Sequence, residues 1–259
     1  MVELKNISFS YPLPRRKKTE ALRGVNAQFE EGSVSAIIGP SGCGKTSLIK
    51  IMAALITPDE GFICINGSQL TGVRRQTAVI FQDYGLLPWK TVRANAELPF
   101  RINGKAEDGR NKVDTLLEEF GLGAFAKQYP HQLSGGMKQR LAIIRALAAE
   151  PELLLMDEPF SSLDALTREA AQDFLLSVRR EHRITVIMVT HSIEEAVYLA
   201  DTVYVMNGVN PGTITDQITV SRDGNVTRTG FRGDQHFQEY CGILRAALPK
   251  PMAANGDAL

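Results

Sequence analysis

The sequence predicts an α/β fold in which helices cover a parallel β-sheet. Three short runs are apolar at almost every position, namely residues 34–38 (VSAII), 153–156 (LLLM) and 184–189 (ITVIMV). Such runs are typical of strands that are buried on both faces, as the central strands of a parallel sheet are. A segment with helical character follows each run, which is the order expected when helices cross over the sheet.

The remaining segments predict two additions to this core. Residues 2–9, 22–30, 61–66 and 76–81 have the character of strands joined by turns, which predicts a separate antiparallel layer. Residues 91–150 have a helical pattern throughout, which predicts a helical subdomain inserted before the strand at 153. The breaks expected in that block are Pro99, Gly104, Gly121 and Pro130.

The charged loop at 12–18 and the C-terminal part are less informative. We interpret residues 12–18 as a solvated hairpin loop, in preference to a nucleotide- or membrane-facing segment. Residues 221–234 are rich in Gly, Arg, Asp and Thr and predict a flexible connection. A short amphipathic helix is expected at 238–247, and residues 249–259 are expected to be disordered.

Composition excludes several classes of protein. With 259 residues, 44% of them hydrophobic and 22% charged, the chain can bury the core of one large or two small domains. The 29 basic and 29 acidic residues cancel, so no overall basic field indicates a nucleic-acid-binding protein. No apolar run approaches the ~18 residues of a membrane span, and residues 1–6 do not resemble a signal peptide. Cys43, Cys64 and Cys241 lack metal-binding spacing, which favours a reduced cytoplasmic protein.

A glycine-rich loop, residues 39–46 (GPSGCGKT), lies between the first apolar strand and a predicted helix at 45–55. Its glycines let the backbone wrap a phosphate chain, and the helix N-terminus adds about half a positive charge. Lys45 is expected to bridge the β- and γ-phosphates, and Thr46 to bind Mg²⁺. The alternative, a chance Gly-Lys-Thr in a turn, is disfavoured because the preceding strand is present. The residues expected to surround the nucleotide are Gly39, Pro40, Ser41, Gly42, Cys43, Gly44, Lys45, Thr46 and Ser47, with the Cys43 thiol incidental.

Polar side chains follow the other two apolar strands. Asp157 and Glu158 end the second, and because successive strand residues point to opposite sides, the two carboxylates can serve a metal and a water molecule separately. An exposed acidic pair is the alternative. His191 ends the third strand, at the edge where open α/β sheets bind ligands. A packing or surface histidine is the competing interpretation there.

A second glycine pair opens a predicted helix in residues 133–140 (LSGGMKQR). Ser134 is a good N-cap residue, and Gly135 and Gly136 leave the first amides of the helix uncovered. Free amides at a positive helix end form an anion site. A plain capped helix after a Gly-Gly turn is the alternative, although it does not explain the uncovered amides.

Together these motifs resemble those of ATP-binding-cassette (ABC) ATPases: 39–46 is similar to the phosphate loop, 153–158 to the Walker B strand and 133–140 to the signature motif. The resemblance covers residues 1 to about 220. It implies an ABC nucleotide-binding domain with a P-loop NTPase (RecA-like) core, followed by a C-terminal extension at 221–259. It also implies ATP and Mg²⁺ as cofactors.

The same resemblance implies roles for further residues. Glu158 would polarise the attacking water, His191 would be the switch histidine that holds it, and Gln82 would sense the metal and the water. Tyr11 would stack on adenine, with Phe9 as a competing candidate. The metal would be bound by Thr46, Gln82 and Asp157.

The resemblance further implies a head-to-tail dimer, of two identical chains or of this chain with a related ATPase subunit. The helix end at Ser134, Gly135 and Gly136 of one subunit would complete the γ-phosphate site of the other, with Asp164 at the seam.

The resemblance of Gln82 and its loop implies that residues 82–92 contact a transmembrane permease. Most of 84–92 is apolar or aromatic, in a loop expected at the surface, and Trp89 is a natural anchor. The alternative is that Leu86, Leu87 and Trp89 cover the helical subdomain.

The loop resembles that of ATPase subunits that import nitrate, sulfonates or taurine. This implies a peripheral protein at the cytoplasmic face of the membrane, working with permease subunits and a separate solute-binding protein and without nucleic acid. A lipid or lipoprotein extractor, an exporter, and a soluble ABC ATPase acting on nucleic acid or ribosomes are the alternatives.

Overall fold

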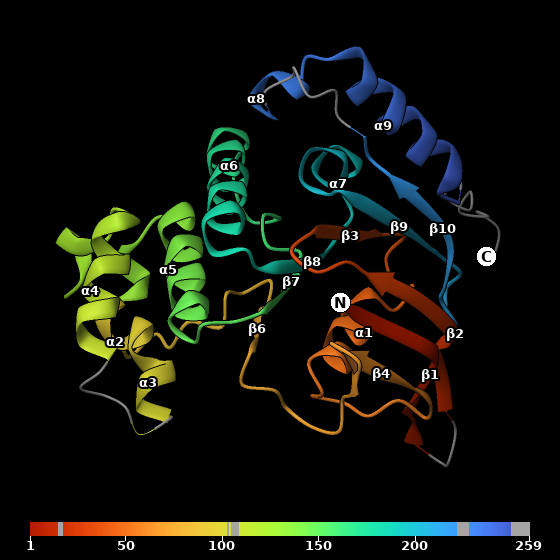
Figure 1. The fold of residues 1–259 in the computed structure, drawn as a ribbon, viewed down its shortest axis with the longest axis horizontal. Coiled ribbons are helices and arrows are strands. Elements are labelled where there is room, and N and C mark those ends of the chain that lie inside the picture. Colours follow the sequence, from red (N-terminus) through yellow and green to blue (C-terminus); the bar gives the residue numbers. More distant parts are fainter. Residues whose placement is uncertain (15–17, 103, 105–108, 222–227, 250–259) are drawn as a thin grey trace, which may run out of the picture.

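Two β-sheets and a group of helices on one side build the fold (Figure 1). The computed structural model describes the chain except for residues 15–17, 103, 105–108, 222–227 and 250–259. The expectations for the charged residues at 15–17, for residues 222–227 of the predicted connection and for the tail at 250–259 therefore lie outside the described residues. None of the described helices combines the length and apolar character that crossing a bilayer requires.

The larger sheet has six strands in the order β10-β9-β3-β8-β7-β6. Its strands are β3 (Val34–Ile38), β6 (Thr77–Ile80), β7 (Leu153–Asp157), β8 (Thr185–Thr190), β9 (Thr202–Asn207) and β10 (Thr213–Thr219). The three apolar runs are β3, β7 and β8, which are buried at every position and pair in parallel, as predicted. The antiparallel pair β9–β10 closes one edge and was not predicted.

The smaller sheet is antiparallel, in the order β2-β1-β4-β5. It consists of β1 (Val2–Pro12), β2 (Lys18–Phe29), β4 (Glu60–Ile65) and β5 (Ser68–Gln69). Three of the four segments predicted for this layer are present, but the fourth prediction, at 76–81, is wrong. That segment is β6, which pairs in parallel with β7 because its buried residues, Ala78 and Ile80, face the core of the larger sheet.

One helix lies between the two sheets. α1 (Lys45–Met52) contacts β7 and β8 of one sheet and β2 of the other, and its Leu48 and Ile49 are fully buried. The helix is shorter than the predicted 45–55, because the backbone turns left-handed at Ala54 (φ 56°). Its first residue follows β3 after the glycine-rich loop, so the loop sits at the carboxyl edge of the parallel strands.

The helical insertion between β6 and β7 is present. It contains α2 (Val92–Ala96), α3 (Leu98–Ile102), α4 (Gly109–Glu119), the 3₁₀ turns η2 (Gly123–Phe125) and η3 (Pro130–Gln132), and α5 (Gly135–Ala148). These helices gather on one side of the molecule in Figure 1. The break predicted at Pro99 is present: α2 ends at Ala96 and α3 begins at Leu98, so that Pro99 lies in the first turn of the new helix, where a proline costs no hydrogen bond.

Four helices complete the described chain: α6 (Ala165–His182), α7 (Ile193–Leu199), α8 (Arg228–Phe231) and α9 (Gln235–Ala247). The predicted helix at 238–247 is α9, which begins three residues earlier at Gln235. The predicted flexible connection at 221–234 is wrong for α8. There Phe231 is buried and meets the Phe237 ring edge to face, with ring centroids 5.5 Å apart, and this apolar burial orders the segment.

Candidate active site

The functional candidates meet at the carboxyl edge of the parallel strands. In the register of the sheet, Ile38 lies beside Thr190, and Asp157 lies beside Val189. The segments that follow β3, β7 and β8 therefore leave the sheet side by side, which is the position of ligand sites in α/β folds.

The loop at 39–46 is built to receive an anion. Gly44 adopts a left-handed conformation (φ 94°) at the N-cap of α1, and no side chain caps the helix. A Cβ at Gly44 would lie 2.5 Å from Leu22 Cδ2, so only glycine fits. The Lys45 side chain is buried, and its Nζ donates to the carbonyls of Gly39 (2.9 Å) and Pro40 (3.0 Å). A buried ammonium and uncapped amides at one helix end fit a phosphate chain.

Within this loop the Cys43 thiol is a packing group. It is fully buried, and burial raises its pKa. A Cβ at Gly39 would lie 2.8 Å from Cys43 Sγ, so the thiol fills the inside of the loop. Ser41 and Gly42 are exposed at the rim of the loop. This agrees with an incidental thiol.

Tyr11, at the end of β1, reaches the start of α1. Its hydroxyl lies 3.0 Å from Ser47 Oγ, and 38% of the residue is exposed. Phe9 is buried and meets the Tyr11 ring edge to face, with centroids 4.8 Å apart. Of the two aromatic candidates, Tyr11 alone offers an accessible ring beside the loop, and Phe9 supports it.

Asp157 and Thr46 form a pair of oxygen ligands. Thr46 Oγ1 donates to Asp157 Oδ1 at 3.2 Å, and burial raises the pKa of this carboxyl. A divalent cation would neutralise such a desolvated carboxylate, and hydroxyl and carboxylate oxygens are ligands that Mg²⁺ prefers. The pair therefore fits the metal that the sequence implied.

Glu158 and His191 face each other. Glu158 Oε2 lies 3.2 Å from His191 Nδ1. The strand ends at Asp157, and Glu158 takes a left-handed conformation (φ 47°) with its N–H donating to Val189 O at 3.0 Å. The two carboxylates thus diverge because of this left-handed turn, and not because of strand pleating as predicted. A non-glycine residue held in this region is strained, which is common at functional sites.

Gln82 reaches the same corner through a serine. Its Nε2 donates to Ser161 Oγ at 3.4 Å, and Ser161 Oγ donates to Glu158 O at 3.0 Å. The structure thus connects Gln82 to the segment that follows Glu158. Sequence reasoning did not single out this use of Ser161, which the serine pair after the acidic residues could have signalled.

The glycine pair at the start of α5 lies at the surface. Ser134 caps the helix by accepting from Met137 N at 3.3 Å, and Ser134 and Gly135 are exposed. A Cβ would lie 2.8 Å from Leu163 at Gly135 and 2.7 Å from Thr167 at Gly136. The two glycines thus allow the start of α5 to pack closely on the side chains of Leu163 and Thr167, a reason that the sequence alone did not reveal.

Asp164 lies at the N-terminus of the neighbouring helix, α6. It caps α6 by accepting from Thr167 N at 3.1 Å, and this interaction with Thr167 lowers the Asp164 pKa. The start of α5 and the start of α6 thus form one exposed corner. The glycines of α5 face Leu163 and Thr167, which flank Asp164 in the same chain.

Comparison with known proteins identifies the family of this arrangement. The family model described as "ABC transporter" matches residues 22–161. The chain is 47% identical over 203 residues to the aliphatic sulfonates import ATP-binding protein SsuB of Bacillus licheniformis, covering 78% of each chain. It is 40% identical over 212 residues to the nitrate import ATP-binding protein NrtD of Synechocystis sp., covering 82% of this chain and 79% of the relative.

A solved structure agrees. The chain superposes on the "Dimeric Structure of MJ0796, a Bacterial ABC Transporter Cassette" with a TM-score of 0.74 and 30% identity, covering 86% of this chain and all of the other. The chain belongs to the ABC transporter ATPase family. It is thus an ATP-binding ATPase of an importer-like group, and the sequence-based assignment of family and fold class is confirmed.

In this ABC ATPase the loop at 82–92 is held by a buried asparagine. Asn95 is fully buried, and its Oδ1 accepts from Leu87 N at 2.9 Å. Its Nδ2 lies 3.1 Å from each of the carbonyls of Leu87, Lys90 and Thr91. Leu86 packs partly buried against the core, whereas Trp89 is 70% exposed. Leu86 therefore covers part of the core, whereas Trp89 lies at the surface.

The base of the same loop is tied to the helical insertion and to the segment after Glu158. Arg145 of α5 donates to Tyr84 O and Gly85 O, both at 2.7 Å, and burial lowers the Arg145 pKa. The Tyr84 hydroxyl lies 3.0 Å from Ser162 Oγ. A displacement of the loop would therefore move both α5 and the segment that follows Glu158.

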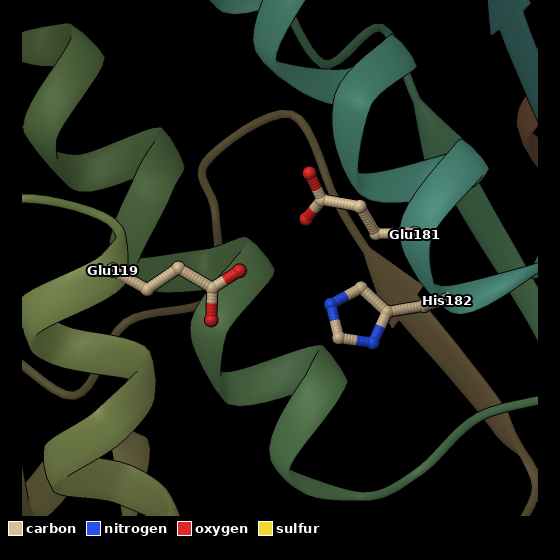
Figure 2. Close-up of side chains that lie close together, drawn as sticks. All are labelled: Glu119, Glu181 and His182. Carbon is tan, nitrogen blue, oxygen red and sulfur yellow. The ribbon is translucent and has the colours of Figure 1, made fainter.

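A second group of metal-ligating side chains lies at the other end of α6. Figure 2 shows Glu119 of α4 directed toward Glu181 and His182 of α6, and their ligand atoms lie within 4.8 Å of one another. The length of α6 separates this group from Asp164 by roughly 27 Å. All three residues are exposed, and exposed acidic groups are common without a bound ion, so we assign no metal to this group.

Proposed function

We propose that this ABC ATPase is the energy-supplying subunit of an importer for a small solute such as a sulfonate, nitrate or taurine. The observation that carries the catalytic part is the Glu158–His191 pair, with 3.2 Å between Oε2 and Nδ1, beside the oxygen pair of Asp157 and Thr46. The solute class rests on the relatives, whose names describe import of sulfonates and nitrate.

Each residue of the site has a defined task in hydrolysis. Lys45 and the amides of 39–46 would bind the phosphates, while Thr46, Asp157 and Gln82 would hold Mg²⁺, which would supply positive charge to the phosphate oxygens. Glu158 accepts a hydrogen bond from the attacking water and polarises it. His191 keeps the Glu158 carboxylate in place. A general base of this kind contributes about 10²–10⁴-fold to the rate.

We further propose that two chains assemble head to tail. The exposed helix end at Ser134–Gly136 of one chain would face the phosphate-binding loop of its partner, and Asp164 would lie at the seam. Bound nucleotide would then attract two positive helix ends at once, one from α1 and one from the partner's α5. Loss of the γ-phosphate weakens that attraction, so hydrolysis favours opening of the dimer.

Coupling to transport would use the loop at 82–92. Trp89 is 70% exposed on a loop that Asn95 holds rigid, as expected of an anchor for a protein partner. We propose that this partner is a permease in the membrane, which places the chain peripherally at the cytoplasmic face. A separate solute-binding protein would deliver the solute.

Co-purification from native membranes tests the proposal. We expect a multispanning permease to co-purify with the chain. We also expect cellular uptake of taurine, alkanesulfonate or nitrate to be lost when Glu158 is replaced. Purification with ribosomes or nucleic acid, and no permease, would contradict it.

The Trp89→Ala variant sharpens this test. Removing a buried aromatic anchor typically weakens an interface by about 2 kcal/mol or more, so the recovered permease should fall strongly while ATP binding persists. Val73→Ala is the matched control, because Val73 is similarly exposed (73%) but lies outside the loop. Equal recovery with both variants would show that Trp89 is not the anchor.

A further inference from the structure

A chain of buried polar side chains connects the turn that carries His191 to the C-terminal helices. It begins at Thr190, whose hydroxyl donates to Glu195 Oε2 and accepts from Ser192 N at 3.1 Å. Ser192 Oγ in turn accepts from Glu195 N at 3.2 Å. Glu195 therefore holds the residues on both sides of His191, and the pattern Ser192-x-x-Glu195 is that of a helix-capping pair.

Gln172 of α6 forms the next link. Its Nε2 donates to Glu195 Oε1 at 3.2 Å, and its Oε1 accepts from Arg232 Nη2 at 2.6 Å. The reversed amide would set oxygen against carboxylate and NH₂ against guanidinium, so its orientation is fixed by both neighbours. Gln172 is 2% exposed and Glu195 6% exposed, and hydrogen bonds in such surroundings reinforce one another.

Arg232 joins the two helices that carry this chain. Its guanidinium stacks on the Tyr198 ring of α7, 3.7 Å from the centroid. Its Nη1 lies 3.6 Å from Glu169 Oε1 on α6. One side chain thus contacts the helix of Glu195 and the helix of Gln172, with cation–π and ionic contacts that a shorter or neutral residue cannot reproduce.

Apolar packing fixes where Arg232 stands. It follows α8 and precedes α9, and Figure 1 shows α9 beside α7. Phe231, Phe237, Cys241 and Leu244 of this segment are buried. The guanidinium is therefore delivered by a packed element, and a shift of that element would be transmitted to Gln172.

We propose that Gln172 and Glu195 are positioning residues for His191, and that Arg232 sets their arrangement, so that the C-terminal helices tune the rate of ATP hydrolysis. The inference rests on the proposed role of His191 in holding Glu158. We expect the effect on the chemical step and not on nucleotide binding. The proposed nucleotide-binding residues, Lys45 and Tyr11, lie at the start of α1 and at the end of β1. Among the described residues, no side chain of the polar chain hydrogen-bonds to either segment.

Steady-state ATPase kinetics of the full-length protein test this, with Arg232→Met against Arg245→Met. Arg245 also joins α9 to α7, through an exposed ion pair with Glu194. The Glu194 carboxylate lies 3.5 Å from Ser192 Oγ, but within the described part of the chain neither side chain of this pair hydrogen-bonds to Glu195 or Gln172. We expect Arg232→Met to lower kcat about 3- to 30-fold with KM for ATP within about twofold, and Arg245→Met to change neither. Arg232→Lys, which keeps a donor for Gln172, should recover part of the loss. Equal kinetics for the two methionine variants would overturn the proposal.

A double-mutant cycle separates positioning from general stability. Gln172→Leu removes the amide at similar volume. If both residues act through one chain, adding Arg232→Met to Gln172→Leu should lower kcat little further. Multiplicative losses in kcat would contradict the proposal. The ring resonances of His191 should shift in Arg232→Met and not in Arg245→Met, and unchanged resonances in both would equally contradict it.

His191→Ala distinguishes the two levels of inference. Wild-type kcat in that variant would overturn the role of His191 in the proposed site, and the positioning chain with it. If His191→Ala is inactive but Arg232→Met and Arg245→Met have the same kcat, only the positioning chain is overturned.

Discussion

At the scale of single residues, the site combines buried charges with strained backbone. Lys45 is a buried ammonium satisfied by carbonyls of its own loop, and Asp157 is a carboxyl whose pKa burial raises. Glu158 is held at φ 47° beside them. Such groups cost stability in the absence of a ligand and are retained where a ligand or a reaction uses them.

Glu195 gives a pH-dependent prediction. Burial raises its pKa, so the folded protein disfavours the ionised carboxylate, and this penalty appears as pH rises above the unfolded pKa. Glu195→Gln lacks the penalty. The difference in thermal midpoint, variant minus wild type, should therefore grow from about pH 4 to about pH 8.

Nearby groups define the control for this measurement. Glu195 faces Arg168 and His191 as well as Thr190 and Gln172, and both basic groups partly offset its burial. Glu194 is the preceding residue and is exposed. The thermal midpoint of Glu194→Gln relative to wild type should therefore not rise with pH through loss of a burial penalty. A difference for Glu195→Gln that stays constant with pH would contradict the account.

At the scale of elements, short segments are held by a few interior side chains. Asn95 of α2 fixes the loop at 82–92, Arg145 of α5 fixes its base, and Ser134 and Asp164 cap the two helices at the exposed corner. The loop can therefore present Trp89 at the surface without depending on a partner for its conformation.

Asn95→Ala tests this anchoring. It would remove the side-chain partner of the half-buried Leu87 N and Lys90 O, while the Leu87 and Thr91 carbonyls keep a backbone N–H each. We expect this to cost about 1–3 kcal/mol in the free energy of unfolding, measured by urea denaturation. Asn111→Ala, on the exposed face of α4, should change it by less than about 0.5 kcal/mol. Equal effects of the two variants would show that the asparagine does not hold the loop.

At the scale of the whole molecule, local patterns predicted the centre of the fold best. The apolar runs of β3, β7 and β8, and the loop at 39–46 between strand and helix, are contiguous in sequence and need no distant partner to be recognised. The sheet to which β6 belongs was mispredicted, because a strand of four residues does not encode its neighbour. α8 was missed because its order depends on the contact between Phe231 and Phe237.

The site followed the same rule. Glu158, His191 and Tyr11 were proposed from motifs, and the structure gives each a neighbour suited to its proposed role. The chain from Thr190 through Glu195 and Gln172 to Arg232 could not be foreseen, since its members come from four separate segments. Only the fold brings them together.

The central claim is that nucleotide joins two copies of this chain through the exposed helix end at Ser134–Gly136. Light scattering of Glu158→Gln in saturating Mg-ATP tests it most directly, because slow hydrolysis should trap the closed pair. We predict twice the mass of the monomer with Mg-ATP, and the monomer mass without it or when Lys45→Ala is added. A monomer in saturating Mg-ATP, with bound nucleotide demonstrated, would contradict the account.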